Sequence, residues 1–380
     1  MMDYYTRYDE LTGSFKQGKD IHLSETNIDI KFFEFNSETA KITNEYLPND
    51  DTINENICFE YPIFTPAGRN RYNNDEAILL LHGLNERSWS KYLTWAEYLC
   101  NNSGKPVILF PISFHINRAP LSWSNPRTMM NLLNFRREKY DNDRSISFAN
   151  VALSDRLSQK PERFYFSGRQ TWADLSTLFE EIMSGKHPLF KEGTKIDIFS
   201  YSIGAFLSQI ALMTNQKNLY TNTKLFMFCG GSIFNSMQGA SRSIMDKPAF
   251  DIIRDYYLHH FGNETTKKET GVNLKHDNAF KAFFSMISPE RFQFERESFF
   301  ASLGKRIKGI ALAKDIVIPF KGIQEAMGIK NSEKNIQLLD FEFPYSHENP
   351  FPLNSEDKTA VNSAFNRIFS DAVNYFTRPV

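Results

Sequence analysis

Six short runs of mainly apolar residues recur along the chain, and each is followed by small, polar or turn-forming residues. They span residues 77–81, 106–110, 195–199, 225–229, 307–312 and 335–341. A strand covered by helices on both faces has this composition, because both of its sides are buried. Most are separated by segments with apolar residues at helical spacing, which include residues 88–101, 170–183, 205–214 and 359–376. Two outer strands are expected before this series, at residues 31–35 and 57–61. The alternation predicts an α/β fold with a mostly parallel sheet and helices on both faces.

The whole chain, residues 1–380, is predicted to form a single domain with an N-terminal arm and two insertions. Residues 1–27 are polar and aromatic without a clear period, and we expect an irregular arm lying on the body. Residues 112–169 are polar and contain several arginines, whereas residues 232–304 hold aromatic-rich helical stretches. Long insertions in a compact domain are usually functional covers, so the second insertion is predicted to be a helical cap.

The charge of the chain is close to neutral, which argues against a nucleic-acid partner. The chain has 44 Lys and Arg against 45 Asp and Glu, whereas nucleic-acid binders usually carry a basic face. No run approaches the roughly 20 apolar residues that span a bilayer, and the first residues lack the pattern of a signal peptide. Three cysteines occur without the spacing of a metal or redox motif: Cys58, Cys100 and Cys229. We expect a cytoplasmic protein, because unpaired cysteines suit a reducing compartment.

The sequence Ser200-Tyr201-Ser202-Ile203-Gly204 lies between an apolar strand and a helix-forming run. This setting is the one that a nucleophile elbow requires, because small residues on either side of the serine allow a sharp turn. The first position is usually Gly and is Ser200 here, a side chain small enough for such a turn. The motif predicts that Ser202 presents its hydroxyl at the carboxyl edge of the sheet.

The turn after the first buried strand reads His82-Gly83-Leu84-Asn85. Together with the serine motif it resembles the α/β-hydrolase superfamily, in its esterase and lipase branch. In that family a His-Gly turn at this place helps to build the oxyanion hole. The resemblance implies that the backbone N–H groups of Leu84 and Ile203 would hold the oxyanion. Tyr201 and Asn85 are the candidate substrate-binding residues, and for the side chain of His82 we expect a structural role that holds its loop.

The last two buried strands are each followed by a candidate for the rest of a catalytic triad. Asp315 follows the strand at residues 307–312 and looks like the acid of the family, and His347 follows the final strand, where the family keeps its base. The order Ser202, Asp315, His347 along the chain is the one expected of this fold. The similarity covers roughly residues 75–376 apart from the two insertions.

The resemblance predicts a serine hydrolase that cleaves a small-molecule carboxylic ester through an acyl-enzyme, without a metal or other cofactor. A thioesterase, an amidase or a peptidase would use the same triad, so the sequence leaves these alternatives open. A non-catalytic relative that binds a ligand is a further alternative, and so is an interaction protein that docks through the aromatic cap.

The side chains of the two insertions allow two interpretations each. The aromatic residues of the second insertion could form the core of the cap, which is the commoner arrangement, or line an apolar acyl pocket. Four arginines of the first insertion are expected either to be solvated or to bind an anionic group of the substrate: Arg118, Arg127, Arg136 and Arg137.

Overall fold

The computed structural model describes residues 2–38, 50, 52–69, 73–264 and 277–378, and within them nine strands form one sheet. The strands are β1 (Ile21–Leu23), β2 (Ile28–Asn36), β3 (Cys58–Pro66), β4 (Glu76–Leu81), β5 (Val107–Leu109), β6 (Lys195–Tyr201), β7 (Leu225–Phe228), β8 (Ile307–Leu312) and β9 (Ile336–Leu339). Their order is β1-β2-β3-β5-β4-β6-β7-β8-β9. Strands β4 to β9 pair in parallel, whereas β1, β2 and β3 form an antiparallel edge that meets β5. The predicted α/β fold with a mostly parallel sheet is confirmed, although the edge strand β9 is not fully buried, because Gln337 and Leu338 are exposed.

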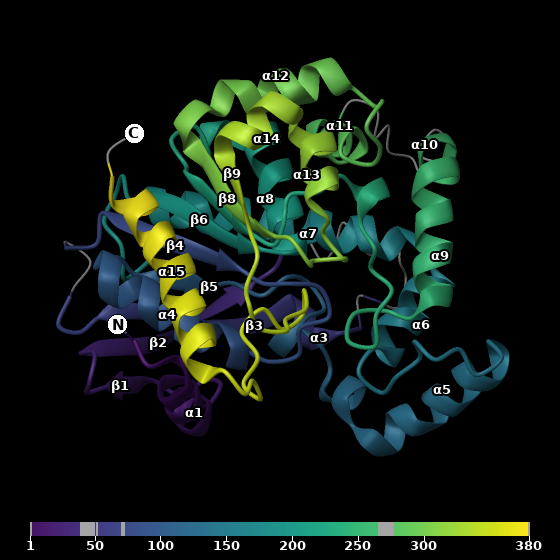
Figure 1. Cartoon of the computed structure of the whole chain (residues 1–380). Coiled ribbons are helices and arrows are strands. Elements are labelled where there is room, and N and C mark those ends of the chain that lie inside the picture. The colour runs from purple at the N-terminus through teal and green to yellow at the C-terminus, as the bar shows by residue number, and fades with distance from the viewer. Residues whose placement is uncertain (1, 39–49, 51, 70–72, 265–276, 379–380) are drawn as a thin grey trace.

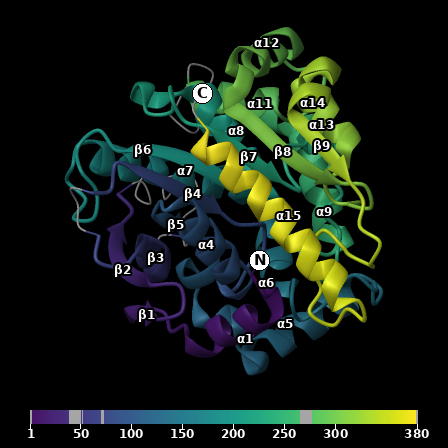
Figure 2. The ribbon, with the colours of Figure 1, turned by 60° about the vertical axis from the view of Figure 1, so that its left-hand side comes forward.

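Helices cover both faces of the parallel strands (Figure 1). Alternate residues of each strand enter opposite cores, so that Leu80 and Phe199 pack with the helices of one face while Leu79 and Ile198 pack with those of the other. The first face carries α1 (Tyr4–Ser14), α4 (Ser90–Ser103) and α15 (Lys358–Thr377), and the second carries α7 (Glu162–Met183) and α8 (Ile203–Thr214). Figure 2 shows α15 running obliquely across the sheet. No helix in the described ranges has the length and the apolar character that a membrane crossing needs.

The expectation of an irregular N-terminal arm is wrong, because residues 4–14 form helix α1. Tyr4 is buried, and its ring stacks on Phe365 with centroids 4.5 Å apart. Its backbone N–H donates to Oδ1 of Asn362 at 2.9 Å, and its hydroxyl donates to the carbonyl of Phe351 at 3.2 Å. The helix is therefore stabilised by residues near the opposite end of the chain, and a local sequence pattern does not reveal such contacts.

Further helices lie in and beside the two long connections: α3 (Asn54–Ile57), α5 (Pro126–Lys139), α6 (Val151–Gln159), α9 (Lys247–Asp255), α10 (Phe261–Glu264), α11 (Asn278–Ser285), α12 (Gln293–Leu303), α13 (Phe320–Met327) and α14 (Ile329–Asn335). Helix α7 begins at Glu162, eight residues before the helix expected from residue 170. Most described aromatic residues of 232–304 are buried, whereas Phe292 and Phe294 are exposed. Arg118 and Arg136 are neither solvated nor available to a substrate, because both are buried in ion pairs with Asp174 and Asp246.

Candidate active site

Ser202 lies in the sharp turn between β6 and α8. Its φ of 57° falls in the left-handed region that residues other than glycine rarely adopt. The turn runs so close to neighbouring backbone that a Cβ on Gly204 would lie 2.8 Å from the carbonyl oxygens of Leu81 and His82. A Cβ on Gly230 would lie 2.5 Å from a side-chain atom of α8. The strained turn presents the hydroxyl of Ser202 at the carboxyl edge of the sheet.

Three side chains from three separate loops meet at this edge. Oγ of Ser202 lies 2.7 Å from Nε2 of His347, and Nδ1 of His347 lies 2.7 Å from Oδ2 of Asp315. Ser202 is 5% exposed, and His347 and Asp315 are each 3% exposed. The structure thus brings the residues predicted as nucleophile, base and acid into one buried, hydrogen-bonded chain.

The carboxylate of Asp315 is held in place by its own loop. Its Oδ1 accepts the backbone N–H groups of Val317 at 2.9 Å and Ile318 at 2.8 Å, which leaves Oδ2 for the imidazole. A carboxylate only accepts hydrogen bonds, so Nδ1 of His347 carries the proton. In this tautomer Nε2 carries no proton and can accept the hydroxyl proton of Ser202.

The turn at residues 82–84 lies beside Ser202 and is fixed by polar contacts. Nδ1 of His82 lies 2.7 Å from the carbonyl of Gly83, and Nε2 accepts the backbone N–H of Ile112 at 2.9 Å. Burial holds the pKa of His82 well below its usual value, so the ring is neutral and serves as one donor and one acceptor. The side chain of His82 therefore has the structural role that we expected.

The two amides predicted to form the oxyanion hole lie on either side of the serine. Ile203 is the first residue of α8, where a helix leaves its N–H groups without partners in the helix. In the turn before Leu84, the N–H of Gly83 is already taken, because it donates to the hydroxyl of Tyr92 at 3.0 Å. The described residues show no acceptor for the N–H of Leu84 or Ile203.

Tyr201 and Asn85, the predicted substrate-binding residues, both border a hollow above Ser202, and each also makes hydrogen bonds within the protein. Tyr201 is 1% exposed, its ring stacks on His347 with centroids 5.4 Å apart, and its hydroxyl donates to the carbonyl of His347. Both N–H groups of the Asn85 amide are used, by the carbonyls of Ala149 at 2.8 Å and Ser243 at 2.7 Å. Tyr201 therefore positions the imidazole, and Asn85 ties two loops together.

A hollow of about 270 Å³ opens above Ser202 and His347. Lys91 lies in its wall, with its ammonium 2.5 Å from Glu86 and 5.1 Å from the centre of the Tyr201 ring. Burial acts to raise the pKa of Glu348 in the same wall, but hydrogen bonds, including one from Ser241, hold that pKa below its usual value. The hollow therefore offers charged groups of both signs near the serine.

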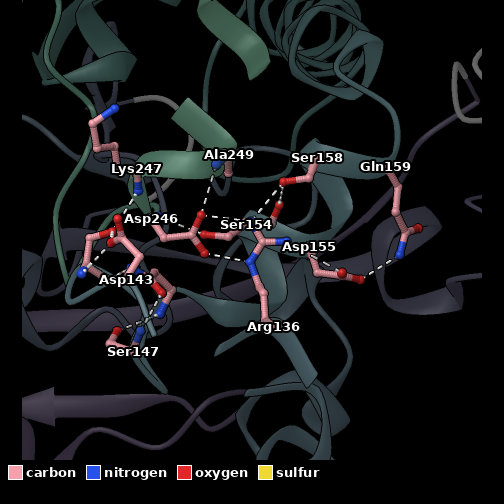
Figure 3. Close-up of polar contacts among 12 residues, drawn as sticks. Arg136, Asp143, Ser147, Ser154, Asp155, Ser158, Gln159, Asp246, Lys247 and Ala249 are labelled. Carbon is pink, nitrogen blue, oxygen red and sulfur yellow. Dashed lines mark hydrogen bonds and ion pairs between the residues drawn. The ribbon is translucent and has the colours of Figure 1, made fainter. Parts of the chain in front are cut away.

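Polar contacts join the two long insertions next to this hollow. The guanidinium of Arg136 on α5 donates to both oxygens of Asp246 at 2.6 and 2.8 Å, as Figure 3 shows. Asp246 also caps α9, because its Oδ1 accepts the N–H of Ala249 at 2.9 Å. The Nδ2 group of Asn150 donates to the carbonyl of Ser241 at 2.8 Å. The first and second insertions are therefore tied to each other and, through Asn85, to the turn beside Ser202.

A second, apolar cavity of about 50 Å³ borders the two predicted oxyanion residues. Its lining residues include, besides Leu84 and Ile203, the side chains of Phe206, Trp172 and Phe283. Phe283 belongs to α11, so at least one aromatic residue of the second insertion lines a pocket rather than serving only as core. In the described part of the chain, no three His, Cys, Asp or Glu side chains are grouped as metal ligands.

Sequence reasoning missed the residues that support the triad. Tyr201 is a candidate for substrate binding in the sequence, yet its hydroxyl contacts a carbonyl 146 residues away. His115 follows the strand that ends at Pro111 rather than the final strand, so the sequence assigns it no catalytic role, yet it borders the apolar cavity. The sequence carries no periodic signal for either role, because each depends on loops that only the fold brings together.

Comparisons with known proteins support the fold. A thermostable esterase from Pseudomonas putida ECU1011 superposes with a TM-score of 0.51 at 10% identity, covering 99% of this chain and 90% of that chain. A mutant of the esterase rPPE gives a TM-score of 0.50 at 10% identity, with the same coverage of 99% and 90%. At this identity the similarity shows the α/β-hydrolase fold alone. No curated protein matches the sequence.

A family model matches most of the chain. The model is described as a "Family of unknown function (DUF6051)", and it matches residues 47–377. This range includes Ser202, Asp315 and His347. Because the match covers well over half of the residues of this chain, the chain belongs to the DUF6051 family.

Proposed function

We propose that this protein is a serine hydrolase that cleaves carboxylic esters of small molecules. The observation that carries the proposal is the buried chain of hydrogen bonds from Ser202 through His347 to Asp315, with both distances at 2.7 Å. A serine hydroxyl is a weak nucleophile by itself, and an adjacent, oriented imidazole is the usual means of activating it. The similarity in fold to two esterases is consistent with this chemistry.

The proposed reaction runs through an acyl-enzyme. His347 takes the hydroxyl proton as Oγ of Ser202 attacks the ester carbon, and Asp315 stabilises the imidazolium that forms. The N–H groups of Leu84 and Ile203 hold the oxygen that becomes negative. The tetrahedral intermediate then expels the alcohol, which receives the proton from His347. A water activated by the same imidazole releases the acid and frees Ser202.

We further propose that residues 112–169 and 232–304 act together as a cap over the site within a single domain. The ion pair between Arg136 and Asp246 and the bonds from Asn85 to both insertions support this arrangement. The free, buried thiols of Cys100 and Cys229 suit a protein that works in the reducing cytoplasm.

The test is the hydrolysis of p-nitrophenyl butanoate by wild type, by Ser202→Ala and by the matched control Ser200→Ala. Ser200 lies two residues earlier, on β6, and its buried hydroxyl has no partner among the described residues. We expect Ser202→Ala to lower kcat by at least about 10³-fold and Ser200→Ala to stay within about tenfold of wild type. A thioester and an anilide in parallel distinguish thioesterase and amidase activity. If no substrate is turned over and Ser202 resists a fluorophosphonate, the fold serves as a binding scaffold.

A further inference from the structure

His115 is a buried imidazole with one nitrogen left unused. It is 5% exposed and borders both the apolar cavity and a neighbouring hollow of about 90 Å³. Its Nδ1 lies 2.9 Å from the carbonyl of Ser113, which only accepts, so Nδ1 carries the proton. Burial lowers the pKa of His115 to about 4, so the ring is neutral near pH 7. Nε2 is then a buried acceptor, and it has no hydrogen-bond partner among the described residues.

The backbone around His115 is strained and fixed to the oxyanion turn. Phe114 has a φ of 66° and Ile116 a φ of 52°, which is a rare conformation for a β-branched residue. The N–H of Ile116 donates to the carbonyl of Glu86 at 3.0 Å, and the N–H of Ile112 donates to His82 at 2.9 Å. Such strain persists only where the surroundings hold it, and it gathers at functional sites. The imidazole therefore has a fixed place relative to the reaction centre.

The apolar cavity beside His115 adjoins the place where the ester carbonyl would lie. Leu84 and Ile203 border this cavity, and Leu84 also borders the hollow above Ser202. An acyl group bound to Ser202 with its oxygen on the two amides has this cavity next to its chain. A volume of about 50 Å³ holds three to five groups of the size of a water molecule. The cavity thus fits a short, branched acyl group.

We propose that His115 selects short acyl groups that carry a hydrogen-bond donor, such as a hydroxyl, which donates to Nε2 while the rest of the chain fills the apolar cavity. This inference rests on the proposed function, since it assigns the acyl side of the ester substrate. A purely aliphatic acyl group that fills the cavity would exclude water and leave Nε2 of His115 without a hydrogen bond. The site would therefore discriminate against acyl groups that lack a hydrogen-bond donor.

The experiment compares kcat/KM for three p-nitrophenyl esters on the wild-type protein. They are 3-hydroxybutanoate, the isosteric 3-methylbutanoate, and 3-methoxybutanoate, which keeps the inductive effect of the oxygen but cannot donate. We expect the hydroxy ester to exceed both others by about fivefold, the order of factor that one hydrogen bond supplies. Equal values for the hydroxy and methoxy esters overturn the inference and leave the hydrolase proposal intact. If none is hydrolysed and Ser202 is unreactive toward a fluorophosphonate, both proposals fall.

Variants separate the role of the acceptor from the stability of the fold. His115→Leu removes the acceptor and should abolish the preference for the hydroxy ester over the other two. His115→Gln retains an acceptor and should keep part of the preference. His187→Gln is the matched control, because it replaces a buried histidine that has partners on both nitrogens, and its preference should equal that of wild type. A preference that survives in His115→Leu contradicts the inference.

Discussion

At the residue scale, four contacts fix the position of His347, three to its imidazole ring and one to its backbone carbonyl. Nε2 faces Ser202, Nδ1 faces Asp315, the ring stacks on Tyr201, and its own carbonyl accepts the hydroxyl of Tyr201. None of these contacts requires a substrate to form. The geometry that the proposed base needs is therefore present before binding, and such preorganisation is how catalytic groups reach high effective concentration.

Replacing Asp315 by Asn tests the role of the charge and the tautomer. The Asn side chain retains an oxygen for the N–H groups of Val317 and Ile318, but it turns an amide donor toward Nδ1 of His347. That donor favours the wrong tautomer, so we expect kcat for ester hydrolysis to fall by about 10³- to 10⁴-fold. Thermal unfolding of the same sample controls for folding. A loss of less than tenfold with an intact fold would argue against Asp315 as the orienting acid.

The triad was predictable from the sequence, whereas its supporting contacts were not. Ser202 and Asp315 follow the buried strands β6 and β8, and His347 follows the edge strand β9. Strand ends of this kind are readable from the sequence. The stacking of Tyr201 on His347 and the open nitrogen of His115 depend on how loops fold over one another. Asn85 lies in the predicted turn, but its amide serves Ala149 and Ser243 because the insertions come within reach.

At the scale of elements, the packing of α8 on β4 depends on the absence of a side chain at Gly204. Gly204→Ala places a methyl group 2.8 Å from the carbonyl oxygens of Leu81 and His82, and the helix must shift away. We expect the free energy of unfolding to fall by about 1–3 kcal/mol and ester hydrolysis to fall with it. Urea denaturation measures the change. Gly13→Ala, in α1 with open space around it, is the control and should be neutral or slightly stabilising.

The ion pair of Arg136 with Asp246 is one of the contacts that join the two insertions. The two residues are 1% and 0% exposed, so removing the cation leaves a buried carboxylate without its main partner. We expect Arg136→Leu to lower the free energy of unfolding by about 3–5 kcal/mol. Adding Asp246→Asn, which retains an oxygen for the N–H of Ala249, should recover part of that loss. Equal stability of the single and double variants would show that the pair is not coupled.

At the scale of the whole molecule, the parallel sheet could be predicted because burial on both faces leaves long apolar runs in the sequence. Strands β4 and β6 to β8 have this pattern almost without interruption. Helix α1 could not be predicted from a local sequence pattern, because Tyr4 packs against the distant rings of Phe351 and Phe365. The sequence does not predict that α7 begins as early as Glu162, because residues 112–169 are polar on the whole. Tyr165 and Phe166 in the first turns of this helix are nevertheless buried.

Three buried histidines predict that the protein loses stability in mild acid. Burial lowers the pKa of His115 and of His187 to about 4 and holds that of His82 well below 6.5. Between pH 6.5 and 4 the unfolded chain therefore binds protons that the folded chain does not. The free energy of unfolding consequently decreases as the pH decreases through this range. A pKa near 4 corresponds to roughly 3 kcal/mol per histidine at pH 4. Urea denaturation across this range measures the slope, which His187→Gln should reduce. A stability that is flat from pH 6.5 to 4 would contradict the burial of these rings.

The most direct test of the central claim is to locate the adduct that a fluorophosphonate forms with the protein. Because the imidazole of His347 already accepts the hydroxyl of Ser202, intact-mass measurement should show one adduct per chain, and peptide mapping should place it on Ser202. His347→Ala should prevent the reaction while the fold remains intact. An unlabelled but folded wild-type protein, or an adduct on another residue, would contradict the assignment of Ser202 as an activated nucleophile.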